Sequence, residues 1–228
     1  MNGHSTRLDY DWFPGSIPAN VRAGSDVYLD TAYSFAPFGS ELDPGLDLGN
    51  ASGAYDRSAF VVGPRGRVSV GAYTCLNGTY VVCNERVEIG SHCFTGWGSV
   101  ITDTWPGLGV SLWDRRAAMR AAAADPQRRL PSAGRPRPVI IEDNVWVGFG
   151  AVVLPGVTLG RGCVVGCKTV VAESVPAFAV LAGDPPCVIR YLEPTERDLS
   201  RHVPTLADAT APGALTGTLA RPRREPRT

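Results

Sequence analysis

The chain has 228 residues, with 22 basic and 22 acidic side chains, so its formal net charge is zero. This length suits one large domain or a domain with tails, and the balanced charge argues against a nucleic-acid or membrane-surface role for the body of the protein. No apolar run reaches the length of a membrane span, and the N-terminus lacks the apolar core of a signal peptide. A cytoplasmic location is therefore expected.

Residues 1–22 combine aromatic side chains with proline and are predicted to form an N-terminal capping segment. Trp12, Phe13 and Ile17 are the apolar residues that would cover the open end of the repeats that follow. We expect those repeats to fill one domain over residues 23–192.

Branched aliphatic residues then recur at six-residue steps, the period of a parallel β-helix. The first hexad is read at 23–28, the count breaks over 36–58, and register returns near Val62. A slip is expected within 83–88. The predicted inward positions of this half are Leu29, Phe35, Val70, Leu76, Val82, Ile89, Thr95 and Ile101.

The repeats stop after Asp103, and residues 104–139 are predicted to be an insertion loop that contains a helix. Residues 115–124 are rich in alanine, and Ser111 with Asp114 resembles a capping box just before them. Insertions in solenoids often line the binding site. The seven arginines of the insertion over 104–139 form either a basic lid for anions or a solvated helix face.

Six unbroken hexads follow over 141–176 and make the period plain. Each begins with a branched aliphatic residue that should fill one layer of the core, and each has a small or medium residue four positions later, where the chain turns. Three hexads make one triangular coil, so we expect two coils here. The paired positions are Ile141 and Val145, Val147 and Ala151, Val153 and Val157, Leu159 and Cys163, Val165 and Thr169, and Val171 and Val175.

The C-terminal part is predicted to leave the solenoid over 177–190. Residues 193–228 have few large apolar side chains and a basic end, which indicates a short cap followed by a disordered tail. The six cysteines show no metal-ligand spacing and there are only three histidines, so no metal site is expected.

Several motifs resemble those of one family. They are Val139-Ile140-Ile141-Glu142-Asp143-Asn144-Val145-Trp146-Val147-Gly148, Leu154-Pro155-Gly156-Val157-Thr158-Leu159-Gly160, Val175-Pro176 and Ala182-Gly183-Asp184-Pro185. The chain resembles the hexapeptide-repeat acyltransferases, in particular the branch of galactoside/maltose O-acetyltransferases and lipopolysaccharide-biosynthesis acetyltransferases. The resemblance implies an all-β, left-handed parallel β-helix, a homotrimer with sites between subunits, and acetyl-CoA or another acyl-CoA as co-substrate.

The family uses a histidine base in the loop after the middle coils, and this chain has Thr104 and Pro106 where such histidines would stand. Two other residues are candidate catalytic bases. Asp103 lies at the exit of a hexad, at the mouth of the expected cleft, or is simply a loop-capping aspartate. His92 lies at a corner that would reach a neighbouring subunit, or is simply a surface histidine.

Candidate acceptor-binding residues are Asn77, Trp105 and Trp113. Asn77 falls within one residue of a family asparagine, or is a turn residue; the two tryptophans flank the insertion and either stack on a sugar or pin the loop. The resemblance assigns acyl-CoA contacts to Trp146, Gly148, Phe149, Cys167, Lys168 and Arg190, although the family has a small residue at Phe149 and a lysine at Glu173.

The sequence therefore predicts transfer of an acetyl or other acyl group from CoA to a hydroxyl or amine of a sugar or small metabolite. The alternatives are a divergent β-helix trimer that acts as a scaffold or binding module, or a different specialised-metabolism enzyme in the same cleft. Fold alone does not decide between them.

Overall fold

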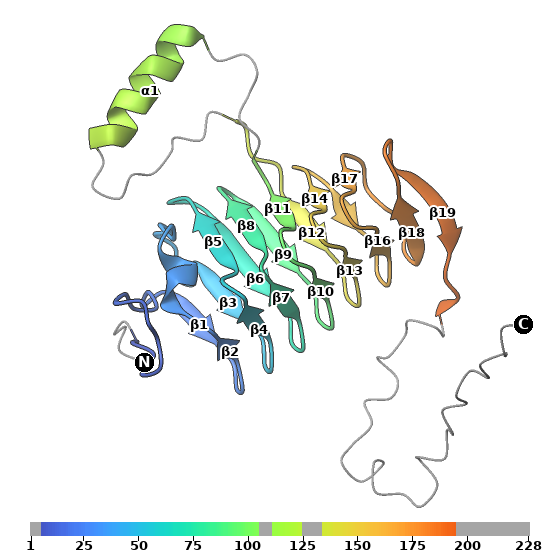
Figure 1. Cartoon of the computed structure of the whole chain (residues 1–228), viewed down its shortest axis with the longest axis horizontal. Coiled ribbons are helices and arrows are strands. Elements are labelled where there is room, and N and C mark those ends of the chain that lie inside the picture. Colours follow the sequence, from blue (N-terminus) through green and yellow to red (C-terminus); the bar gives the residue numbers. More distant parts are fainter. Residues whose placement is uncertain (1–5, 105–110, 125–133, 195–228) are drawn as a thin grey trace, which may run out of the picture.

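The computed structural model describes residues 6–104, 111–124 and 134–194 and shows a three-sided parallel β-solenoid. The strands stack as successive coils from the N-terminal to the C-terminal end (Figure 1). One side is a six-stranded sheet of β1 (Val21–Ala23), β3 (Leu46–Leu48), β6 (Arg67–Val70), β9 (Arg86–Ile89), β12 (Val139–Ile141) and β15 (Thr158–Leu159).

The other two sides complete each coil. The five-stranded sheet contains β5 (Ala59–Val62), β8 (Tyr80–Cys83), β11 (Val100–Thr102), β14 (Val152–Val153) and β17 (Val170–Val171). The eight-stranded sheet contains β2 (Tyr28–Leu29), β4 (Gly53–Tyr55), β7 (Cys75–Asn77), β10 (Phe94–Thr95), β13 (Trp146–Val147), β16 (Val164–Val165), β18 (Ala179–Ala182) and β19 (Cys187–Tyr191).

The hexads over 141–176 form the two coils that their period predicts. All twelve predicted inward residues are at most 5% exposed, including Thr169 and Cys163 at turning positions. Parallel pairing keeps the layers aligned, as in Ile141 with Leu159, Val147 with Val165 and Val153 with Val171. Stacking buries the aliphatic face that no coil could bury alone.

The N-terminal half is more regular than the sequence indicated. Residues 36–58 were predicted to break the count, but Leu48, Ala54 and Phe60 point inward at steps of six and are at most 1% exposed. The prediction for Val82 is wrong, because Val81 pairs with Phe60 and Ile101 and fills the layer. The corner before β8 has one residue fewer than a regular hexad, and the corner after β8 has two more. The register of the inward residues therefore shifts at both corners.

The N-terminal segment is tied to the first coil. Thr6 forms an antiparallel bridge with Ile17, which packs against the core. Asp11 accepts hydrogen bonds from the Thr31 hydroxyl and from the N–H groups of Phe13 and Ala32, which begins the 3₁₀ helix η1 (Ala32–Phe35). Burial is the largest single effect and would raise the pKa of Asp11, but these three hydrogen bonds and the charge of Arg7 together outweigh it and lower the pKa.

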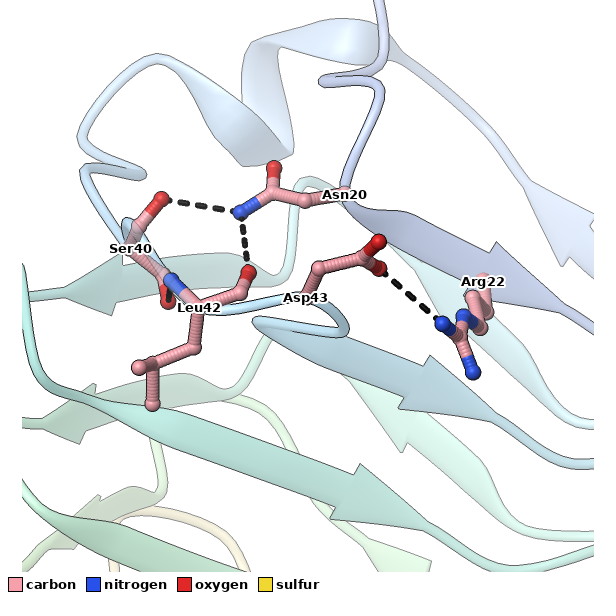
Figure 2. Close-up of polar contacts among 5 residues, drawn as sticks. All are labelled: Asn20, Arg22, Ser40, Leu42 and Asp43. Atoms are coloured by element: carbon pink, nitrogen blue, oxygen red, sulfur yellow. Dashed lines mark hydrogen bonds and ion pairs between the residues drawn. The ribbon is translucent and has the colours of Figure 1, made fainter. Parts of the chain in front are cut away.

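The loop that leads into β3 is held by the turn before β1. The Asn20 amide donates to the carbonyl oxygens of Ser40 and Leu42, both at 2.8 Å, and Arg22 forms an exposed ion pair with Asp43 at 3.1 Å (Figure 2). The two hydrogen bonds from the Asn20 side chain satisfy backbone carbonyl groups that lie outside the sheet hydrogen bonding. An irregular loop can therefore join a regular coil without leaving these acceptors unpaired.

The insertion separates β11 from β12 and contains helix α1 (Leu112–Ala124), which stands apart from the coils in Figure 1. The predicted cap is present: the Asp114 N–H donates to the Ser111 hydroxyl, which in turn donates to the Asp114 carboxylate. At the C-terminus, β18 still continues the eight-stranded sheet. The chain leaves the coils only afterwards, when β19 turns back antiparallel to β18.

Candidate functional site

The solenoid has three corners, and the predicted site residues are divided among them. His92 lies between the six- and eight-stranded sheets, and we call this the His92 corner. Gly78, Trp97 and Phe149 lie between the eight- and five-stranded sheets, at the Trp97 corner. Asp103 lies where the chain leaves the five-stranded sheet, at the Asp103 corner. One copy of the chain therefore does not bring its candidate bases together.

Asp103 is buried inside its corner, with no exposed surface. Its carboxylate accepts the N–H groups of Asn84, Glu85 and Arg86 at 2.7 to 3.0 Å and the Thr104 hydroxyl at 2.6 Å. It closes the wide turn of the preceding coil. The sequence placed Asp103 at the mouth of a cleft, and the structure corrects this, because the turn amides draw the side chain inward.

The charge of Asp103 also acts on its neighbour Cys83. Burial first, and the carboxylate second, raise the pKa of the Cys83 thiol far above its ordinary value. The thiol donates to the Arg67 carbonyl at 3.3 Å. Cys83 is thus a neutral core residue and not a nucleophile.

His92 faces outward, as predicted for its corner. Its backbone is left-handed, with φ of +57°, and its N–H donates to the Ala72 carbonyl. The ring stacks on Tyr73, with centroids 5.1 Å apart and planes 13° apart. The imidazole is half-buried, so it remains accessible to a second molecule. His4 and His202 lie outside the described residues.

The Trp97 corner carries a groove of about 530 Å³ that sequence reasoning missed. Tyr33, Tyr80 and Trp97 line it with half-exposed rings, and Asp56 and Arg57 add a carboxylate and a guanidinium. Such a mixture of aromatic faces and charged hydrogen-bonding groups suits a sugar or another amphipathic small molecule. The three aromatic residues come from η1, from β8 and from the corner after β10, so no regular spacing in the sequence indicated the groove.

Local geometry fixes the position of Trp97. Gly78 has φ of +58°, and a Cβ there would lie 2.8 Å from the Trp97 Cδ1, so the indole needs glycine beneath it. Trp97 also contacts Phe149 of the next coil, with centroids 5.5 Å apart. Asn77, the predicted acceptor residue, directly precedes Gly78 at the end of β7, beside the groove.

The residues predicted to contact CoA lie on or beside the C-terminal half of the eight-stranded sheet. Trp146 is half-exposed and packs edge-on against Phe94. Gly148, Phe149, Cys167 and Lys168 follow β13 and β16 at the Trp97 corner, where the Lys168 N–H donates to the Phe149 carbonyl at 2.7 Å. Arg190 lies on β19, opposite Val180.

The remaining predicted residues belong to the insertion. Trp105 lies outside the described residues. Trp113 is 75% exposed on α1, where the Arg116 guanidinium lies 5.1 Å from its ring centroid, so its described contact is within the helix. Within the described ranges, no cluster of three His, Cys, Asp or Glu side chains could hold a metal ion, and no helix is long and apolar enough to cross a membrane.

Fold and site together define a left-handed parallel β-helix of hexapeptide repeats. Residues 138–173 match the family described as bacterial transferase hexapeptide (six repeats). The chain is 46% identical over 61 residues to the 2,3,4,5-tetrahydropyridine-2,6-dicarboxylate N-acetyltransferase of Clostridium perfringens, a stretch that covers 27% of this chain and 26% of that enzyme. The chain also matches two putative acetyltransferases of yeasts. The match covers 27% of the length of the Schizosaccharomyces pombe protein and 37% of the length of the Saccharomyces cerevisiae protein.

Two solved structures share the fold. One is a hexapeptide-repeat acetyltransferase of Vibrio cholerae in complex with acetyl-coenzyme A, with TM-score 0.51, 23% identity, and coverage of 65% of this chain and 72% of that chain. The other is a mutant of AntD, an N-acyltransferase of Bacillus cereus, in complex with dTDP and coenzyme A. Its TM-score is 0.53 at 16% identity, with 78% and 85% covered.

Proposed function

We propose that this protein transfers an acyl group from acyl-CoA to a hydroxyl or amine of a saccharide or small metabolite. The observation that carries the proposal is the match of residues 138–173 to a transferase family, over the stretch where the coils are most regular. The likeness to an N-acetyltransferase over 61 residues supports it.

We infer that the working form is a homotrimer with its sites between copies. The outer face of the five-stranded sheet supports this, because Tyr80, Val100, Val152 and Val170 form one aligned row along it. Tyr80 is 50% and Val170 48% exposed in the single chain. An apolar sheet face of this kind is stabilised when a second copy covers it.

A trimer would also explain how candidate residues on different corners of one chain could act at the same site. Within one chain the corners carrying His92, Asn77 and Asp103 point in different directions, whereas packing of copies in a trimer would bring a corner of one against a face of the next. The acceptor would lie in the groove beside Trp97 and Tyr80, where ring faces and Asp56 hold it. The donor would run along the C-terminal coils past Trp146, Lys168 and Arg190.

The chemistry is direct attack. The acceptor oxygen or nitrogen forms a bond to the thioester carbonyl carbon, the C–S bond breaks, and CoA leaves with the electron pair on sulfur. The acceptor proton ends on that sulfur as the free thiol. For a hydroxyl acceptor, His92 of a neighbouring copy is the better placed candidate carrier of this proton, because its ring is accessible while both oxygens of Asp103 are occupied. An amine acceptor has less need of a base.

Calorimetry with acetyl-CoA tests the first step. Binding is expected below millimolar concentration, and its absence at millimolar concentration refutes the proposal. Turnover is then followed by chromatography of free CoA, since Cys167 and Cys187 are exposed and would consume thiol reagents. His92→Ala is expected to lower turnover on hydroxyl acceptors. Asp26→Asn, an exposed change in the first coil at the same corner, is the matched control.

A binding or scaffold role is the second candidate. It is favoured by the structural use of Asp103 and by Phe149, whose ring fills space above Gly96 at the Trp97 corner. This reading predicts that the trimer forms but that acetyl-CoA does not bind. The same calorimetry therefore separates the two functions.

A further inference from the structure

The insertion returns to the solenoid through Arg135-Pro136-Arg137-Pro138. Each proline fixes its own φ and restricts the residue before it to an extended conformation. In an extended chain, side chains at i and i+2 project to the same side. The alternation therefore aims the two arginines in one direction.

Arg137 is anchored through its backbone to two successive coils. Its N–H donates to the Asp103 carbonyl at 2.8 Å, and its carbonyl accepts the Gly156 N–H at 3.1 Å. Gly156 has φ of +85°, and a Cβ there would lie only 3.3 Å from the Arg137 Nε. The bare glycine lets the arginine side chain lie along the coil, so its direction is set by the fold and not by chance.

Both arginines line a cavity of about 260 Å³, whose remaining walls are Leu154, Pro155 and Ala172. The lining holds two positive charges and no carboxylate, and neither arginine forms an ion pair within the described part of the chain. A water occupies about 30 Å³ of liquid, so the space admits a phosphoryl group with some of its hydration. Both arginines are exposed in the single chain, so water screens part of their attraction for an anion, and paired charged hydrogen bonds are the main contribution to binding.

We propose that Arg135 and Arg137 form a binding site for a phosphoryl group at the Asp103 corner. Planar guanidinium groups bind phosphate oxygens in pairs, which suits two arginines on the same side of one strand. Glu173, which follows Ala172, is exposed and does not line the cavity. The site thus carries net positive charge.

Two molecules could bring this group. One is the diphosphate-bearing end of the acyl-CoA donor, an assignment that rests on the proposed function. The other is a phosphorylated acceptor or free phosphate, which needs no CoA at all. The shared chemistry is the phosphoryl anion, and the probes below distinguish its sources.

The test uses the full chain, with inorganic pyrophosphate as the first probe in calorimetry. Arg135→Gln/Arg137→Gln is compared with Arg115→Gln/Arg120→Gln, which removes the same charge from helix α1. We expect pyrophosphate to bind the wild type and the control alike and to bind the first variant at least about tenfold more weakly, since each charged hydrogen bond contributes about that factor. Added salt should weaken the wild-type binding.

CoA and pantetheine, which lacks the phosphates, form the second pair of probes. Weaker CoA binding with unchanged pantetheine binding in the Arg135→Gln/Arg137→Gln variant assigns the site to the donor. Unchanged CoA binding with weaker pyrophosphate binding assigns it to another phosphorylated ligand. Failure of pyrophosphate to bind the wild type, or equal binding to the first variant, overturns the site even if acetyl-CoA is turned over.

Discussion

Replacing Asp103 by asparagine should destabilise the fold and reveal what this carboxylate does. The side chain has no exposed surface and accepts three backbone N–H groups, from Asn84, Glu85 and Arg86. Asparagine keeps one acceptor oxygen but turns an N–H₂ group toward these donors. At least one amide then loses its acceptor, and hydrogen bonds to a charge are replaced by neutral ones. The expected loss is about 2–4 kcal/mol of unfolding free energy.

Urea unfolding at one fixed protein concentration measures this loss as a lower midpoint. Asp47→Asn, an exposed strand position, is the matched control and should leave the midpoint unchanged. Hydrogen exchange supplies the local readout, since the amides of residues 84–86 should lose protection first. An unchanged midpoint with protected amides would refute the structural account, and a fall in turnover alone would favour the role of a base.

Three further outcomes follow from burial and charge. A thiol reagent at pH 8 should label Cys167 and Cys187 in the native protein and Cys93 only after unfolding, because burial raises the Cys93 pKa to about 11; native labelling of Cys93, read by mass spectrometry, would contradict this. Phe60→Ala should cost about 3–5 kcal/mol in urea unfolding, because the buried ring stacks on Phe35; a loss below 1 kcal/mol would mean that the layer repacks. The lowered pKa of Asp11 stabilises the fold above the unfolded-state value of about 3.9, and this contribution is lost as pH falls through the folded-state value. The midpoint difference between wild type and Asp11→Asn should therefore shrink from pH 7 to pH 3, and a constant difference would argue against the shift.

The repeat made the later coils predictable. Over 141–176, each hexad begins with a branched aliphatic residue and each turn has the same length, so counting is enough. Near Val81 and Val82 counting fails, because adjacent valines make both registers equally apolar and only pairing with Phe60 and Ile101 decides. Over 36–58 the inward residues are present, but Gly and Pro in the corners obscured them.

The candidate site was less predictable for a related reason. Sequence spacing gives the corner on which a residue lies but not whether its side chain turns in or out. Asp103 turns in, because three amides of a wide turn converge there. The groove beside Trp97 combines residues from three coils and from η1, so no single segment of the sequence predicts it. Arg137 belongs to a segment whose anchoring only the folded backbone reveals.

The reversed strand β19 forms the last edge of the eight-stranded sheet. A parallel solenoid offers its last coil as a template for another, so chains of this kind risk adding end to end into filaments. β19 runs against β18, and the pairing shifts register between Val180 and Leu181. An incoming parallel strand finds neither the direction nor the spacing of the repeat at this sheet. The reversal between β18 and β19 thus acts as a stop to polymer growth at this edge of the eight-stranded sheet.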